Sequence, residues 1–140
     1  MTVPVREQRI DVRSERARAR DLLGPLEARI MEAAWTGHLP DPFVVRDVHI
    51  LLPDLAYTTV MTTVARLATK GILSVNRSHA ARAHRYRVAE APGELIERLS
   101  RAEAGQAVAR FGDAALAAFA AELDRLNPAQ RERLRRLAER

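Results

Sequence analysis

The chain has 140 residues, of which 47% are hydrophobic, so it can form one small domain with an appended helical module. Its formal net charge of +5 favours nucleic acid or another anionic partner over an acidic one, although a merely basic protein is the alternative. The absence of cysteine excludes disulfides, thiolate metal sites and cysteine nucleophiles. No apolar run is long enough to span a bilayer, so we expect a cytoplasmic protein without membrane insertion.

Residues 1–21 are predicted to form an Arg-rich N-terminal arm. Arginines recur in this segment at helical spacing, but acidic residues offset the basic stripe that they would form. The apolar content of the arm is too low to bury much surface. Two interpretations stay open: a solvated, partly ordered extension, or an arm that contacts the DNA backbone or minor groove.

Residues 22–90 are predicted to form a DNA-binding domain that starts with two helices. The pair Gly24–Pro25 is typical of a helix start, and the apolar period that follows ends at Trp35. A proline-rich turn then precedes a short strand at Phe43–Val44. A second helix is predicted from about Val45 to Leu52, where a proline closes it.

A third helix begins near Tyr57, inside the segment from Leu55 to Ala89, which contains no acidic residue. At 100° per residue, one side of this helix collects the residues expected in the core: Tyr57, Val60, Val64, Leu67 and Ala68. The other side and its flank carry the candidate DNA-binding residues Thr58, Thr59, Met61, Thr62, Arg66 and Lys70. Threonine offers a hydroxyl for phosphates or base edges and a methyl for thymine, while arginine can pair with guanine.

Residues 72–77 and 85–88 are predicted to pair as a β-hairpin, which after three helices outlines a winged helix. Its basic residues, expected to contact DNA phosphates, are Arg77, Arg82, Arg85 and Arg87. A solvated hairpin is the alternative. His79 and His84 lie across the connecting loop, but no carboxylate accompanies them, so we predict neither a metal site nor a cofactor.

Residues 91–140 are predicted to form a helical dimerisation domain. The helical pattern runs from Pro92 to Leu126 with interruptions at Gly105 and Gly112, and Asn127–Gln130 caps a last helix. Single apolar stripes on such alanine-rich helices indicate packing against a partner. The stripe residues expected at the dimer surface are Leu95, Leu99, Leu116, Phe119, Leu123, Leu126, Leu134 and Leu137. Packing onto the first domain of the same chain is the alternative.

The fold class predicted is therefore mainly α with a small β-wing: an N-terminal winged helix-turn-helix followed by a C-terminal helical dimerisation module. Several motifs resemble the BlaI/MecI family of penicillinase repressors: the run 55–62 (LAYTTVMT), the run 66–71 (RLATKG), the opening 23–27 (LGPLE), the Ile30–Met31 to Trp35 spacing, and 83–86 (AHRY). The resemblance covers about residues 22–140 and is most specific in the third helix. It implies a homodimer that binds a palindromic operator on double-stranded DNA and represses β-lactamase or other resistance or stress genes.

The resemblance also implies modes of inactivation that this chain matches only in part. In the β-lactam branch, a membrane sensor system triggers cleavage near an Asn-Phe pair, and the closest counterpart here is Ala118–Phe119, without the asparagine. The copper-responsive branch uses a C-terminal cysteine cluster, which this chain lacks.

No motif for catalysis is present: the sequence has no glycine-rich phosphate loop, no nucleophile elbow and no zinc-protease helix. We therefore predict a dimeric transcriptional repressor and no enzyme. The alternatives are a winged-helix module that docks a protein, and a regulator that responds directly to a ligand or metal.

Overall fold

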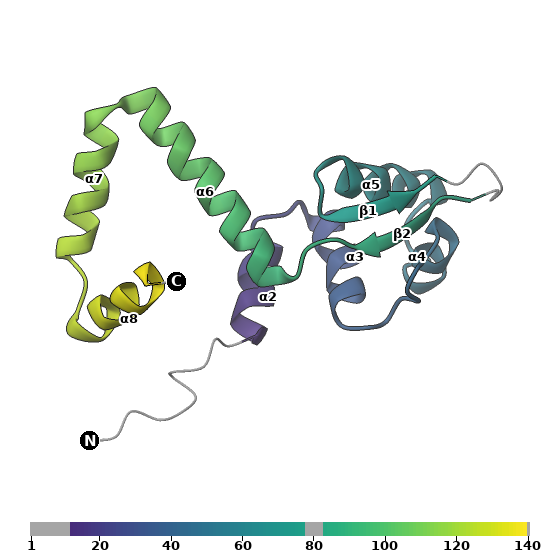
Figure 1. The fold of residues 1–140 in the computed structure, drawn as a ribbon. Helices are drawn as coiled ribbons and strands as arrows, with labels where there is room; N and C mark the ends of the chain where they lie inside the picture. The colour runs from purple at the N-terminus through teal and green to yellow at the C-terminus, as the bar shows by residue number, and fades with distance from the viewer. Residues whose placement is uncertain (1–11, 78–82, 140) are drawn as a thin grey trace, which may run out of the picture. The chain divides into compact units, whose positions relative to one another are not determined.

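The computed structural model describes residues 12–77 and 83–139, and the chain divides into two compact units, Met1–Arg98 and Leu99–Arg140. The first unit contains, in order, α2 (Val12–Asp21), α3 (Pro25–Trp35), α4 (Val45–Leu51), α5 (Tyr57–Thr69), β1 (Leu73–Asn76) and β2 (Arg85–Val88) (Figure 1). The helix α6 (Pro92–Phe111) begins in the first unit and ends in the second, which also holds α7 (Asp113–Asp124) and α8 (Pro128–Ala138). The predicted boundary at residue 91 falls just before α6, whose first turns belong to the first unit.

Helix α3 begins and ends where the sequence predicts. Gly24 is the residue before the first turn, Pro25 occupies the first helical position, and the Gly24 amide donates to the Glu27 carboxylate at 3.1 Å. After Trp35 the chain leaves the helix through Gly37, whose φ of 78° is the left-handed conformation that glycine adopts without a steric cost. The predicted start and end of this helix are confirmed.

Helices α4 and α5 pack against each other in the first unit. Before α4, the Val44 amide donates to the Asp47 carboxylate at 2.9 Å, which satisfies one of the free donors of the first turn. Helix α5 ends just before Gly71, which has a φ of 81°. Val48 of α4 is fully buried, as are Val60 and Val64 of α5, so the two helices contribute to one core.

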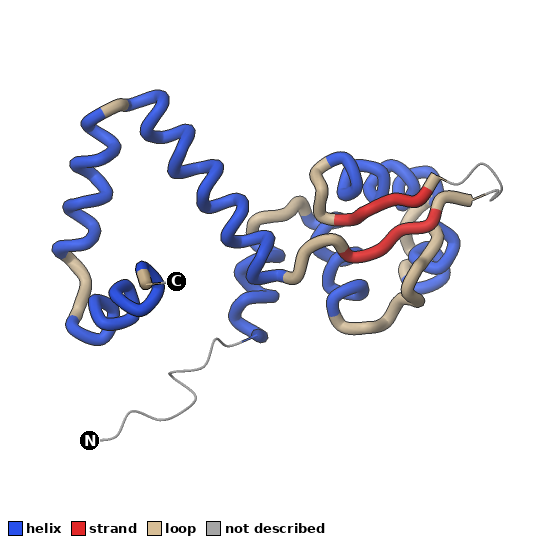
Figure 2. The backbone as a smooth tube through the Cα atoms, viewed as in Figure 1, coloured by secondary structure: helices blue, strands red, loops and turns tan. Residues whose placement is uncertain are grey.

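Strands β1 and β2 form an antiparallel hairpin in which Leu73 pairs with Val88 and Val75 pairs with Tyr86 (red in Figure 2). The predicted Phe43–Val44 strand is reduced to a single bridge, in which Phe43 and Tyr86 exchange two backbone hydrogen bonds of 2.9 and 2.8 Å. The two rings stack with centroids 5.8 Å apart. The wing is thereby attached to the helical core at one buried aromatic pair.

Helix α2 corrects the prediction for the second half of the N-terminal arm. Residues 12–21 form a helix whose Ala19 is fully buried, and Arg16 and Arg20 each lie 3.6 Å from the carboxylate of Glu32 on α3. Small side chains permit this close approach even though the segment is polar overall, which an argument from mean apolar content misses. Residues 1–11 of the predicted arm lie outside the described residues.

The second unit also departs from the prediction at one glycine. Helix α6 continues through Gly105, so the predicted interruption there is wrong, because helix-forming neighbours tolerate a glycine in the interior. The break occurs at Gly112, where φ is 60°. Helix α8 starts as predicted: the Asn127 side chain accepts from the Gln130 amide at 2.8 Å, and the Gln130 side chain accepts from the Asn127 amide at 2.9 Å.

Across the part of the chain that the structure describes, no helix is both long and apolar enough to cross a membrane.

Candidate nucleic-acid interface

One side of α5 is fixed in the core, and this determines which residues face outward. Val60, Val64 and Leu67 are fully buried, and Thr63 is buried as well, with its hydroxyl donating to the Thr59 carbonyl at 2.7 Å. Tyr57 was predicted in the core, and this is wrong, because its side chain is 47% exposed. It occupies the first turn, beyond the layer of buried residues, with its ring edge-on to His49 at 5.5 Å.

The outward side of α5 carries most of the residues predicted to contact DNA. Thr58, Met61, Thr62 and Arg66 are exposed, and Thr59 is half-buried. Ala65 is exposed on the same side and was not among the predicted site residues. An alanine at this position gives no polar signal in the sequence, and only the helical spacing from Met61 and Thr62 would have found it.

Several threonine hydroxyls of α5 are already engaged with the helix backbone. The Thr62 hydroxyl donates to the Thr58 carbonyl at 2.9 Å, and the Thr69 hydroxyl donates to the Ala65 carbonyl at 3.0 Å. These side chains keep oxygen lone pairs and a methyl group for an outside partner, because the hydroxyl proton is used internally. The predicted ability of Thr62 to donate a hydrogen bond outward is therefore reduced.

The predicted cations of the interface fall into two groups. Arg66, Arg77 and Arg85 are exposed, and within residues 12–77 and 83–139 no ion pair is formed by any of them. Arg87 lies 3.3 Å from the carboxylate of Asp41, and both side chains are exposed. An exposed pair of this kind is weak, so Arg87 can exchange its partner for a phosphate. Arg82 lies outside the described residues.

Lys70 has a partner within the chain. Its amine lies 2.9 and 3.0 Å from the two carboxylate oxygens of Glu27, a side chain that is only 6% exposed. Because Glu27 is a buried carboxylate, it needs this counter-ion, and the charge of Lys70 is largely neutralised before any DNA arrives. The structure therefore gives Lys70 a role inside the fold that the sequence pattern did not indicate.

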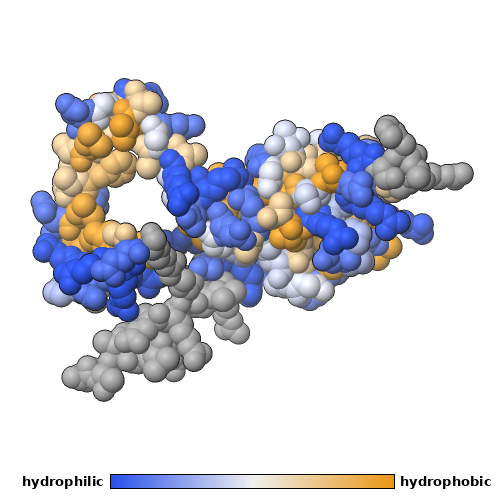
Figure 3. Space-filling model, in the orientation of Figure 1, coloured by the Kyte–Doolittle hydropathy of each residue, from blue (hydrophilic) through white to orange (hydrophobic). Residues whose placement is uncertain are grey.

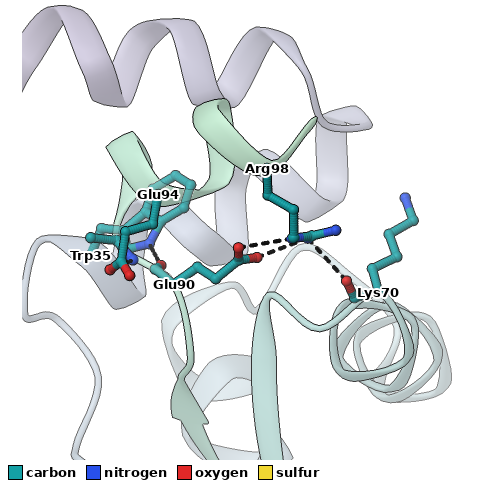
Figure 4. Close-up of polar contacts among 6 residues, drawn as sticks. Trp35, Lys70, Glu90, Glu94 and Arg98 are labelled. Carbon is teal, nitrogen blue, oxygen red and sulfur yellow. Dashed lines mark hydrogen bonds and ion pairs between the residues drawn. The ribbon is translucent and has the colours of Figure 1, made fainter. Parts of the chain in front are cut away.

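A second contact at the end of α5 comes from α6 (Figure 4). The Arg98 guanidinium donates to the Lys70 carbonyl at 3.1 Å and makes two hydrogen bonds of 2.8 Å to the Glu90 carboxylate, which raise the pKa of Arg98. The Glu90 carbonyl in turn accepts from the Trp35 indole at 2.9 Å. Helix α5 is thereby held at its C-terminal end by side chains from both α3 and α6.

Two further features bear on the interface. Arg46, in the first turn of α4, is exposed and was not predicted as a site residue, although a cation at the start of the helix before the recognition helix is well placed for a phosphate. Among the described residues, no group of three or more histidine or acidic side chains could hold a metal ion. His84 is described and exposed, whereas His79 is not described.

The residues predicted to form a dimer surface differ in how far they are buried. Leu95 is fully buried in the first unit, so it is a core residue and is removed from the predicted dimer surface. Leu99 and Leu126 are half-buried. The exposed members are Leu116, Phe119 and Leu123 on α7 and Leu134 and Leu137 on α8. Figure 3 shows apolar side chains gathered along α7. Ala118 and Phe119 are both exposed within α7.

The helices α3, α4 and α5 are followed by an antiparallel hairpin, and α5 is open to solvent on its polar side; this arrangement defines a winged-helix protein. The sequence model of the penicillinase repressor family matches residues 23–140, and the chain belongs to that family. It is 43% identical over 77 residues to the transcriptional regulator BlaI of Mycobacterium tuberculosis, in both strain CDC 1551 / Oshkosh and strain H37Rv. Each match covers 53% of this chain and 53% of the relative, so the chain spans about half the length of the curated relatives it matches. Helix α2 precedes the residues that the family model matches.

Proposed function

We propose that the chain is a sequence-specific transcriptional repressor that binds double-stranded DNA through its winged helix. In this proposal α5 enters the major groove and Arg77, Arg82, Arg85 and Arg87 of the wing contact the phosphate backbone. The observation that carries the proposal is the exposed side of α5, where Thr58, Thr62 and Arg66 stay open to solvent while the opposite side is buried. The names of the matched family and of the two relatives support the same function.

We propose further that the repressor acts as a homodimer on a palindromic operator. The exposed apolar side chains of α7 and α8 favour a partner helix, because leaving several leucines and a phenylalanine in water is unfavourable by about 25 cal/mol per Å² of apolar surface. A two-fold protein dimer requires two half-sites related by the same symmetry. The regulated genes proposed from the family resemblance are those for β-lactamase or other resistance or stress functions, with a membrane sensor system as an indirect partner.

The test is binding to DNA enriched from a random duplex pool with the full-length protein. We expect an enriched palindrome, and we expect its affinity to fall steeply with salt, with a slope in log Kd against log salt that reflects several phosphate contacts. Fluorescence anisotropy with the enriched duplex and a scrambled duplex of equal length gives both quantities. Equal affinity for the two duplexes, or binding that is insensitive to salt, would rule out the proposal.

A further inference from the structure

The outward side of α5 carries exposed methyl groups as well as polar and basic groups. Thr58, Met61, Thr62 and Ala65 are all exposed and are spaced at i, i+3, i+4 and i+7, so they form one stripe along the helix. Each of these four side chains carries one methyl group: the Cγ2 methyl of each threonine, the thioether methyl of Met61 and the Cβ methyl of Ala65. We call these four residues the methyl stripe. Met61 is 46% exposed, a large apolar area for a helix surface.

The hydrogen bond of Thr62 fixes how this residue can meet a partner. Its hydroxyl donates to the Thr58 carbonyl at 2.9 Å, so the oxygen lies against the preceding turn of the helix. With the oxygen held against the helix backbone, the methyl group occupies a different staggered position at Cβ, on a residue that is exposed. Towards an outside partner, Thr62 therefore offers a methyl group and an oxygen that accepts a hydrogen bond but has no free proton to donate.

We propose that the methyl stripe reads thymine methyl groups in the major groove, an inference that rests on the proposed DNA-binding function. The A·T pair is the base pair that presents a methyl group there, and its adenine presents an amino donor that matches the acceptor oxygen of Thr62. A C·G pair offers an amino donor without a methyl. Thr58, Met61, Thr62 and Ala65 are thus specificity-determining residues for A·T pairs under α5.

The surroundings of the methyl stripe favour DNA over an apolar groove on another protein. Arg66 follows Ala65 directly, and Arg77 and Arg85 lie exposed at the ends of the two strands. No acidic residue occurs between Leu55 and Ala89. An apolar protein groove would leave these cations without partners, whereas a duplex supplies phosphates on both sides of the groove that receives the stripe.

The test replaces thymine by deoxyuridine, which differs only in lacking the methyl group, one position at a time in the enriched operator. At the contacted positions we expect Kd to rise by about 4-fold for each methyl removed, which corresponds to about 0.8 kcal/mol for one buried methyl-sized group. Positions outside the footprint of α5 serve as internal controls and should not respond.

Two conservative variants of Thr62 separate the methyl from the hydroxyl. Thr62→Ser removes the methyl and keeps the oxygen, so affinity for thymine and for deoxyuridine should become equal at its position. Thr62→Val keeps a methyl and removes the oxygen, so the ratio of about 4-fold between the two duplexes should persist while overall affinity falls. Both substitutions are at an exposed helix position of similar propensity, and circular dichroism verifies that the fold is retained.

The possible results distinguish this inference from the function on which it rests. An enriched operator whose affinity is unchanged by deoxyuridine at every position overturns the methyl reading and leaves the repressor proposal intact. If no duplex is enriched over random DNA, both proposals fail, and the methyl stripe would then be available to an apolar protein surface. A deoxyuridine effect that persists undiminished in Thr62→Ser assigns the contact to other residues and contradicts the role given to Thr62.

Discussion

Two cations, Arg66 on α5 and Lys70 at the cap directly after it, are separated by one helical turn and have different roles. The sequence pattern predicts the same role, a DNA contact, for both residues, because both fall on the polar side of the predicted helix. In the fold, the Lys70 amine is within 3.0 Å of both Glu27 carboxylate oxygens, whereas Arg66 is exposed. The difference arises from Glu27, a buried acid more than forty positions away in sequence, which no local pattern connects to Lys70.

We expect Arg66→Ala to weaken operator binding by about 10-fold or more, since removing a charge-assisted contact to a base or phosphate costs on the order of 1–3 kcal/mol. The melting temperature should be unchanged. Arg133→Ala, which removes the same charge from an exposed position on α8, is the matched control and should bind normally. Equal loss in both variants would mean that only net charge matters, and the specific role of Arg66 would be abandoned.

We expect Lys70→Met to lower stability, because it leaves the buried Glu27 carboxylate without its counter-ion. A loss of about 1–3 kcal/mol is the usual cost of an uncompensated buried polar group, which lowers the melting temperature of a domain of this size by several degrees. The double variant Glu27→Gln/Lys70→Met should recover most of this loss, since a neutral amide needs no cation. Unchanged melting together with weak DNA binding would instead restore the predicted DNA contact of Lys70.

At the scale of the elements, glycine conformation decides where the helices of the second unit end. Gly105 and Gly112 look equivalent in the sequence, and both were predicted to interrupt the helix. Gly105 lies inside α6, and Gly112 has a φ of 60° between α6 and α7. What distinguishes them is the backbone conformation that the surrounding helices impose, which is a tertiary property.

We expect opposite effects when each of these glycines is replaced by alanine. Gly105→Ala should raise stability by up to about 1 kcal/mol, because alanine is the better helix former and nothing lies within 4 Å of the added methyl. Gly112→Ala should lower stability by about 1–2 kcal/mol, because its left-handed φ is unfavourable for any residue with a side chain. Thermal unfolding followed by circular dichroism compares the two, and destabilisation in both would place the helix break at Gly105 after all.

Much of the first unit could be predicted from the sequence because its elements begin and end at strong local signals. Gly24–Pro25, Gly37 and Gly71 each mark a helix end that the structure confirms. Helix α2 could not be predicted as a packed element, because its contact depends on one alanine and on two arginines that pair with Glu32 of α3. The prediction that Tyr57 lies in the core was wrong for a related reason. Periodicity gives the direction of a side chain, but it does not give how far the neighbouring helices extend over that side chain.

On the scale of the whole molecule, the feature that needs a partner is the apolar surface of α7 and α8. The sequence predicted a stripe that also included Leu95, and this residue belongs to the core of the first unit. Heptad-like spacing identifies an apolar side and does not tell which part of the same chain or of another chain covers it. The remaining exposed residues therefore define the surface on which the dimer proposal depends.

We expect Leu123→Asp to convert the dimer into a monomer with weak operator binding, because a charge would be buried in an apolar contact. Sedimentation equilibrium measures the association directly. Ala121→Asp is the matched control: this alanine is exposed on the opposite side of α7, and the variant should remain dimeric. If both variants remain dimeric, the dimer interface lies on another surface of the protein.

The pairing of Lys70 with Glu27 also provides a chemical reporter. Lys70 is the only lysine in the chain, so an acylating reagent such as an N-hydroxysuccinimide ester has a single side-chain amine to modify. Acylation requires the amine to be deprotonated and free of its carboxylate partner, and it therefore proceeds only when the contact opens. The rate of labelling at this one position, followed by mass spectrometry, reports how often the contact between Lys70 and Glu27 opens.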